Sequence, residues 1–172
     1  MTLANRCRRI GMLCVDVDGV LSPGDIVYAQ ASGMFQRSDC GEEKAFHVRD
    51  GSGFKRWHNA GKHSAIVTGR QSAMVSVRAR ETGIAHVLQG CRDKVESLEG
   101  LLADLKVELS EVCFVGDDVI DVGVMERVGL AVAVADACVE ARQSAHYITR
   151  QPGGRGAVRE VIELILRCQG TW

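Results

Sequence analysis

Short runs of consecutive apolar residues alternate along this chain with stretches in which apolar residues recur every three to four positions. The apolar runs fall at 12–16, 64–68, 112–115 and 130–134. Such near-continuous apolar character is typical of strands buried on both faces, as in parallel sheets. The amphipathic stretches between them, for example 73–82 and 95–107, predict helices.

This alternation predicts an α/β fold, a Rossmann-like parallel sheet with helices on both faces. Gly83 and Gly129 stand where helix C-caps are expected. Residues 153–156 (GGRG) predict a loop that opens an amphipathic helix at 157–168. Residues 22–45 break the alternation, and their glycines and β-type residues predict a hairpin flap after the first strand.

Composition adds few constraints. A chain of 172 residues, 46% hydrophobic and 25% charged, predicts one domain spanning 1–172 with a sizeable core. A net charge of −1 gives no reason to expect binding to nucleic acid or to a membrane surface. Arg6, Arg8 and Arg9 precede an apolar run too short for a signal peptide, so we expect a basic arm and a cytoplasmic protein.

The seven cysteines predict free thiols. Their number is odd and they form no CxxC pair, while a disulfide framework or zinc site would have tighter spacing. Cys14 and Cys113 fall inside apolar runs, where they are expected to pack as small buried hydrophobes.

Two aspartates close the first predicted strand. Asp16 and Asp18 lie two residues apart, so on an extended chain their side chains face the same side. Ligands bind at the carboxyl ends of parallel strands, and a buried carboxylate there needs a partner or a metal. Gly19 permits a sharp turn directly afterwards.

Three more acids, Asp117, Asp118 and Asp121, follow the run 112–115. Taken alone, they are equally well explained as caps of the next helix. Beside Asp16 and Asp18, their convergence at one sheet edge favours a bound cation. Oxygen ligands at an open site favour Mg²⁺.

A hydroxyl and two cations complete the candidate chemistry. Thr68, a glycine and Arg70 end another strand in the sequence IVTGR, a combination suited to a phosphate or carboxylate. Lys94 opens a predicted helix and supplies a further cation, although a lone lysine in this position is more often solvated.

In this order the motifs resemble those of the haloacid dehalogenase-like phosphatases, whose four motifs are matched by DVDGV (16–20), Thr68, Lys94 and GDDVID (116–121). Within them, FHVRDGSGFK (46–55) and GGRGAVRE (153–160) resemble 3-deoxy-D-manno-octulosonate 8-phosphate phosphatases. The resemblance covers about residues 10–170. It implies a cytoplasmic, Mg²⁺-dependent sugar-phosphate phosphatase of lipopolysaccharide biosynthesis. It further implies a homotetramer without a cap domain, in which a neighbouring subunit covers the active site.

The resemblance also implies roles for the motif residues. Asp16 would be the nucleophile that forms an aspartyl-phosphate, and Asp18 the general acid and then base. Thr68 and Lys94 would hold the phosphoryl oxygens.

The same resemblance implies a metal site. Mg²⁺ would bind the Asp16 carboxylate, the Asp18 backbone carbonyl and Asp117. Asp121 would orient that shell or Lys94, and the role of Asp118 stays open.

Substrate contact is implied for seven positions: His47, Arg49, Asp50, Gly51, Lys55, Arg70 and Arg78. Three of them keep simpler explanations. Arg78 is compatible with a surface helix, Lys55 with a solvated side chain, and His47 with a residue of the flap.

Four features depart from the family's usual sequence. Residues 22–24 (SPG) replace an acidic step, and 33–40 lengthen the flap. Lys55 stands where arginine is common, and His47 where asparagine is common. All lie where the sugar would be recognised, so the reaction type is better defined than the substrate.

Three other functions remain open. One is a phosphatase of the same group for a nine-carbon 2-keto sugar acid phosphate or another phosphomonoester; Arg70 argues against the nine-carbon substrate, whose enzymes carry an acid there. Another is a non-catalytic tetrameric scaffolding domain, which Asp16, Asp18 and Lys94 argue against. A phospho-acceptor domain has no evident use for Asp18.

Overall fold

The computed structural model describes residues 1–30 and 40–172. Its strands are β1 Met12–Val15, β2 Val27–Gln30, β3 Cys40–Glu43, β4 His63–Thr68, β5 His86–Gln89, β6 Val112–Gly116, β7 Leu130–Ala133 and β8 Tyr147–Ile148. Its helices are α1 Leu3–Arg9, α2 Val48–Asn59, α3 Ala73–Thr82, α4 Lys94–Leu105, α5 Val119–Met125, α6 Val139–Ser144 and α7 Ala157–Gln169, with a 3₁₀ turn at Leu109–Glu111.

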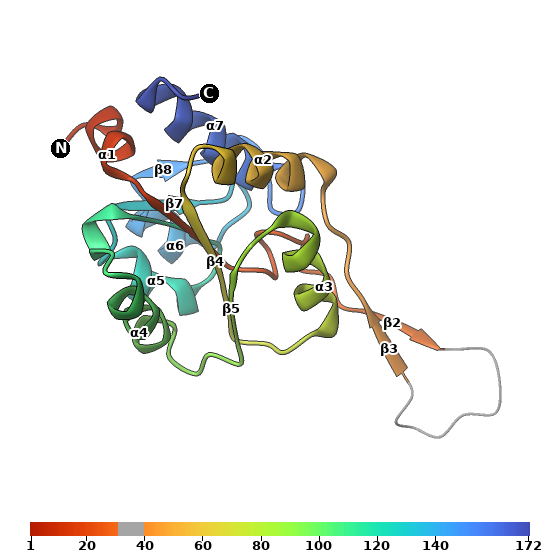
Figure 1. The fold of residues 1–172 in the computed structure, drawn as a ribbon. Helices are drawn as coiled ribbons and strands as arrows, with labels where there is room; N and C mark the ends of the chain where they lie inside the picture. Colours follow the sequence, from red (N-terminus) through yellow and green to blue (C-terminus); the bar gives the residue numbers. More distant parts are fainter. Residues whose placement is uncertain (31–39) are drawn as a thin grey trace.

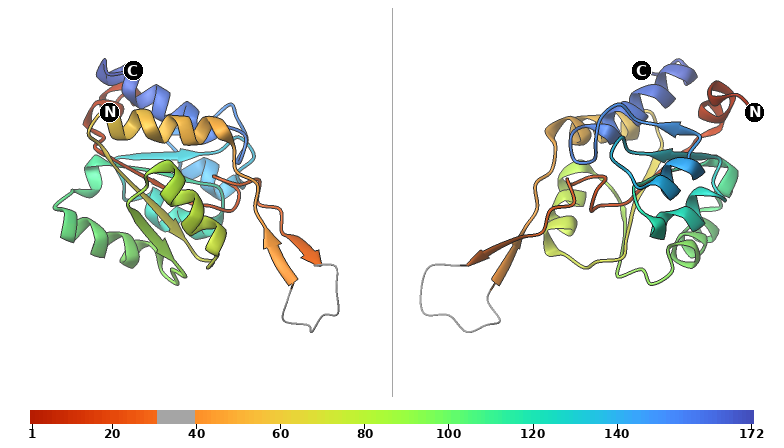
Figure 2. Two further views of the ribbon diagram at one scale, coloured as in Figure 1. Left: turned by 45° about the vertical axis from the view of Figure 1, so that its right-hand side comes forward. Right: turned by 180° about the vertical axis from the view of Figure 1, so that it is seen from behind.

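Six strands form one parallel sheet in the order β5-β4-β1-β6-β7-β8 (Figure 1). Helices α1, α2, α3 and α7 pack on one another along one face, and α4, α5 and α6 along the other (Figure 2). The predicted Rossmann-like α/β fold is therefore confirmed. The helical segments between successive strands supply the long connections that parallel pairing requires.

The centre of the sheet fixes where the candidate residues lie. All four residues of β1 are fully buried, and Val15 pairs with Ile66 on one side and with Val115 on the other. The strands β1, β4 and β6 therefore end at the same edge. Asp16, Thr68 and Gly116 meet there because each stands at or just beyond the end of its strand.

The antiparallel pair β2 and β3 forms a separate small sheet that projects from the body (Figures 1 and 2). The predicted hairpin is thus confirmed for its described strands. Phe35 and residues 33–39 of the lengthened flap lie outside the described residues, whereas Cys40 begins β3. Ile26 and Val27 keep exposed apolar side chains near its base, with exposed fractions of 48% and 47%.

Several local predictions were wrong or missing. The N-terminal basic segment is the helix α1, capped by Thr2, and not an arm. Gly83 caps α3 in the left-handed conformation as expected, but Gly129 caps no helix. A Cβ at Gly129 would lie 2.0 Å from the Ser110 carbonyl oxygen, so close backbone approach explains this glycine.

The edge strands β5 and β8 were not predicted, because neither is a fully buried apolar run. Within residues 1–30 and 40–172, no helix is long and apolar enough to cross a bilayer. The six cysteines whose side chains are described are free thiols, and Cys14 and Cys113 are buried as predicted.

Candidate active site

A buried lysine joins two of the predicted aspartates. The Lys94 Nζ lies 3.0 Å from Asp16 Oδ2 and 2.7 Å from Asp121 Oδ1. All three side chains are at most 5% exposed. Burial alone would lower the pKa of Lys94, but the charges of Asp16 and Asp121 outweigh it and raise that pKa. Lys94 therefore remains a cation at the end of β1.

The three acids after β6 were expected either to cap the next helix or to bind a cation, and the structure divides them between these two roles. Asp118 and Asp121 form the capping box of α5, as the helix-cap explanation requires. Asp121 Oδ2 also accepts from the amides of Asp117 and Asp118 at 3.0 and 3.2 Å. Asp121 thus has both oxygens engaged, while Asp117 caps nothing. Asp117 and Asp16 are therefore the two aspartates that cation binding explains.

Two carboxylate oxygens at this edge are buried and have no hydrogen-bond partner: Asp16 Oδ1 and Asp117 Oδ1. Ligand oxygens of Asp16, Asp117 and Asp121 lie within 4.8 Å of one another. Burial, the largest effect, raises the pKa of Asp16. The charge of Lys94 lowers it and that of Asp121 raises it, and the result is a pKa of about 6. Burial and three neighbouring acids raise the pKa of Asp117 to about 7. Two unpartnered hard oxygens fit a divalent cation.

An acidic cavity of about 380 Å³ opens beside these carboxylates. It is lined by Asp18, Gly19, Pro23, Gly24, Asp25, Asp117, Asp118 and Asp136. Gly19 has φ +87°, and a Cβ there would lie 2.1 Å from Asp117 Oδ2, so glycine is required for the close approach of the two loops. No sequence pattern pointed to Asp136, which accepts a hydrogen bond from the Gly153 amide at 2.8 Å.

Asp18 faces cations from two other segments. Arg70 Nε lies 3.8 Å from Asp18 Oδ2, and the Lys44 ammonium contacts Asp18 Oδ1. Glu42 pairs with both cations, at 2.5 Å from Arg70 and 3.4 Å from Lys44. Thr68 is buried at the end of β4 and accepts from the Arg70 amide at 3.4 Å. Lys44 and Glu42 were missed by sequence reasoning, which treated the flap as apolar surface.

Four predicted substrate residues pack together in a closed cluster with no room for a water molecule: His47, Asp50, Gly51 and Arg78. The Arg78 guanidinium donates to the His47 carbonyl at 3.0 Å and lies over the Phe46 ring. Asp50 accepts from the Arg159 amide at 2.7 Å. This cluster joins α2 to α3 and α7 rather than lining an open pocket.

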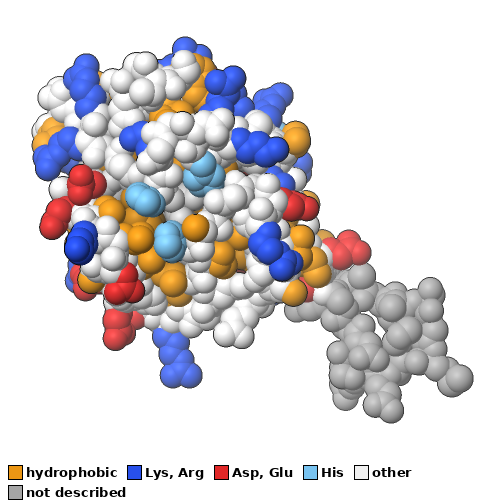
Figure 3. All heavy atoms as spheres, viewed as in Figure 1, with side chains coloured by type: hydrophobic (Ala, Val, Ile, Leu, Met, Phe, Trp, Pro, Cys, Tyr) orange, Lys and Arg blue, Asp and Glu red, His pale blue; other side chains and the backbone are white. Residues whose placement is uncertain are grey.

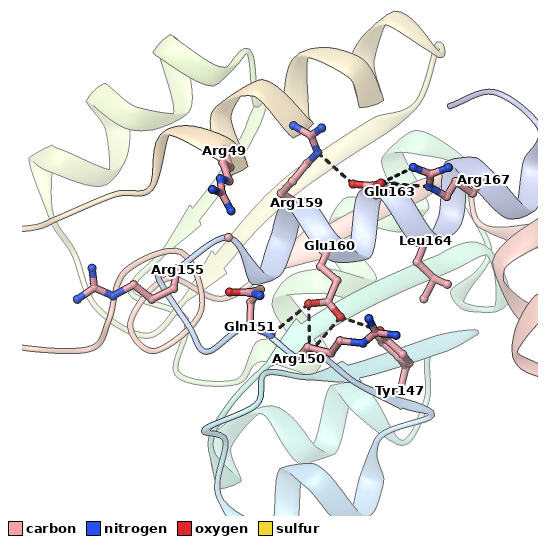
Figure 4. Close-up of a pocket in the computed structure, with 11 residues that line it drawn as sticks. Arg49, Tyr147, Arg150, Gln151, Arg155, Arg159, Glu160, Glu163, Leu164 and Arg167 are labelled. Carbon is pink, nitrogen blue, oxygen red and sulfur yellow. Dashed lines mark hydrogen bonds and ion pairs between the residues drawn. The ribbon is translucent and has the colours of Figure 1, made fainter.

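Arg49 and Lys55 are exposed on α2, and neither lines the acidic cavity. Arg49 instead lines a groove of about 660 Å³ along α7, together with Arg150, Arg155, Arg159 and Arg167 (Figure 4). Glu163 pairs with Arg159 and Arg167 inside this groove (Figure 4). Basic side chains on the face shown in Figure 3 also gather over α1, α2 and α7. The small net charge is therefore the sum of an acidic region at the sheet edge and a basic region along α7.

Comparison with known proteins places this geometry in a family. Residues 75–162 match the model of the haloacid dehalogenase-like hydrolases. The 3-deoxy-D-manno-octulosonate 8-phosphate phosphatase of Yersinia pestis is 45% identical over 164 residues, which cover 95% of this chain and 83% of that protein. The chain belongs to this phosphatase family.

Solved structures of the 3-deoxy-D-manno-octulosonate 8-phosphate phosphatases have the same fold. The Moraxella catarrhalis enzyme, in complex with magnesium ion, phosphate ion and KDO, superposes with a TM-score of 0.90 at 42% identity, covering 97% of this chain and 91% of that one. The Yersinia pestis structure gives 0.90 at 43% identity, covering 98% and 87%. The family resemblance expected from DVDGV and GDDVID is confirmed.

Proposed function

We propose that this protein is a Mg²⁺-dependent phosphatase that hydrolyses 3-deoxy-D-manno-octulosonate 8-phosphate through an aspartyl-phosphate on Asp16. One observation carries the proposal: the buried Asp16 carboxylate keeps Oδ1 free beside the free Oδ1 of Asp117, while Lys94 holds its other oxygen. The family relationship at 45% identity supports the substrate. Residues 1–172 act as a single phosphatase domain, whose flap is predicted at 22–45, and the described residues form no cap domain.

Asp16 is the nucleophile. Its carboxylate projects from the end of β1, where the Asp16 amide donates to the Val115 carbonyl at 3.0 Å and fixes the backbone. Mg²⁺ would be held by the Asp16 carboxylate, the Asp18 backbone carbonyl and Asp117, and it would supply positive charge between nucleophile and phosphate. Lys94 and Thr68 bind the phosphoryl oxygens, whose charge grows in the transition state.

Asp18 is the general acid and base. It stands two residues beyond Asp16 on the same side and lines the acidic cavity, where a departing sugar oxygen can reach it. Asp18 protonates that oxygen as the bond to phosphorus breaks, then removes a proton from the water that attacks the aspartyl-phosphate.

Sugar recognition is assigned to residues on both sides of the site. Arg70, next to Asp18, binds the sugar carboxylate. The other predicted contacts lie on α2, at its N-cap or against it: His47, Arg49, Asp50, Gly51, Lys55 and Arg78. Because Arg49 and Lys55 are exposed and do not line the acidic cavity, we assign them to the active site of a neighbouring subunit in a homotetramer.

The exposed apolar residues Ile26 and Val27 on the projecting hairpin support that assembly, since a neighbouring hairpin would bury them. The six free thiols support a reducing compartment, the cytoplasm. Light scattering coupled to size-exclusion chromatography measures the assembly, and a monomeric mass would refute it.

The activity is tested by phosphate release from a panel of sugar phosphates with Mg²⁺, for wild type and Asp16→Asn. We expect turnover of the eight-carbon keto-sugar phosphate that is lost in the variant. Preference for a nine-carbon or unrelated phosphate would change the substrate and keep the chemistry. Absence of release from every substrate would favour a scaffolding role.

A further inference from the structure

Each aspartate of the DVD motif forms an ion pair with a different lysine. Lys94 pairs with Asp16, and the Lys44 ammonium contacts Asp18 Oδ1 directly. The Lys44 side chain is only 1% exposed. A lysine this buried is rare unless it is paired, because removing its charge from water is costly.

The contact depends on the hairpin. Lys44 directly follows β3, which ends at Glu43, so the returning strand brings this side chain back to the loop after β1. Glu42, on the same strand, lies 3.4 Å from the Lys44 ammonium and also pairs with Arg70. The strand β3 therefore carries an ion-pair network into the active site.

The Asp18 carboxylate is held on both of its oxygens. Lys44 and the Ser22 hydroxyl, at 3.4 Å, contact Oδ1, and Arg70 approaches Oδ2. Ser22, Lys44 and Arg70 belong to three different segments of the chain. A carboxylate constrained in this way has little freedom to rotate away from the cavity.

We propose that Lys44 is a positioning residue for Asp18, which it holds in line with the leaving oxygen of the substrate. This inference rests on the proposed role of Asp18 as general acid. Lys44 itself exchanges no proton with the substrate. Its removal leaves the nucleophile Asp16 and its partner Lys94 in place but deprives the departing oxygen of a correctly placed proton donor.

Leaving-group dependence separates this role from a merely structural one. A sugar alkoxide is a poor leaving group and needs the proton, whereas 4-nitrophenolate leaves without it. Because Asp18 also serves the later hydrolysis step, which all substrates share, the quantity compared is the rate of leaving-group release in a single turnover. We expect Lys44→Met to lower that rate for the eight-carbon sugar phosphate by about 100-fold, the lower range of general-acid contributions. For 4-nitrophenyl phosphate, release of nitrophenolate in a single turnover should fall less than about fivefold, and Lys44→Arg should restore part of the lost rate for the sugar phosphate.

The controls fix the interpretation. Glu43→Gln changes an exposed neighbour on β3 and should leave both rates unchanged. Asp18→Asn should reproduce the leaving-group selectivity of Lys44→Met. If Lys44→Met does not fold, Lys44→Arg keeps the charge, and a selective loss of its single-turnover sugar release tests the same point.

Two results would overturn the proposal: equal loss on both substrates in the Lys44 variants, or no loss on either. Failure of the proposed function gives a different pattern. There, wild type itself releases no phosphate from the sugar substrate, or Asp18→Asn slows single-turnover release of both leaving groups equally, and the positioning role then fails with it.

Discussion

Asp117 provides a quantitative test of the metal site. Its buried Oδ1 has no hydrogen-bond partner, so its ionised form is unfavourable unless a cation is bound. Burial, then the charges of its acidic neighbours, raise its pKa from the usual 3.8 to about 7. The folded protein therefore favours protonated Asp117. The resulting stabilisation is complete below about pH 4 and is lost as the pH rises through 7.

The substitution Asp117→Asn removes this penalty in metal-free protein. The difference between pKa 3.8 and about 7 corresponds to about 4 kcal/mol in a fully buried site. Asp117 is partly exposed, so solvent screening reduces this to about 2 kcal/mol. We expect the metal-free variant to be more stable than wild type by that amount at pH 8, which is roughly 4–8 °C in Tm. The advantage should shrink as the pH falls from 7 to 4.

Added Mg²⁺ should reverse the order. Wild type gains stability by binding, about 2.7 kcal/mol at a hundredfold excess over Kd, while Asp117→Asn gains much less. Chemical denaturation in EDTA and in Mg²⁺, from pH 4 to 8, measures both effects. Asp104→Asn, on the exposed face of α4, is the matched control and should respond to Mg²⁺ as wild type does. Destabilisation of Asp117→Asn in EDTA at pH 8, or equal stabilisation by Mg²⁺, would refute the reasoning.

Two further substitutions test neighbouring contacts. Asp121→Asn leaves an acceptor for the amides of 117 and 118 but removes one anion from buried Lys94; we expect about 3 kcal/mol lower stability and reduced turnover, measured by denaturation and phosphate release. Unchanged stability would show that Asp16 alone suffices for Lys94. Gly19→Ala forces a side chain into a φ of +87° and against Asp117 Oδ2; we expect about 1–3 kcal/mol of destabilisation and a smaller Mg²⁺-induced rise in Tm. A wild-type response to Mg²⁺ would contradict the close approach.

The fold was predictable because its central strands are apolar along their whole length. Residues 12–15 and 112–115 could be identified from sequence, since strands buried on both faces need no alternation. The edge strands β5 and β8 could not, because each contacts the core on one side only and carries mixed residues. Gly129 resembled a helix cap, but its constraint is a long-range contact with Ser110.

The candidate site was predictable where its residues follow strand ends. Asp16, Thr68 and Asp117 lie at one edge because parallel strands end together. The sequence could not distinguish the helix-capping Asp118 and Asp121 from Asp117. That distinction depends on which carboxylate oxygens already accept hydrogen bonds. Lys44 was not predictable, because only the return of the hairpin brings it to Asp18.

The most direct test of the account is chemical trapping of the aspartyl-phosphate. Asp18→Asn is incubated with Mg²⁺ and 4-nitrophenyl phosphate, whose leaving group departs without an acid, and is then treated with borohydride, which reduces an acyl phosphate to the alcohol. Peptide mass spectrometry should find homoserine at position 16 only, and none in the double variant that also carries Asp16→Asn. Reduction at another aspartate, or an unmodified position 16 while phosphate is still released, would contradict Asp16 as the nucleophile.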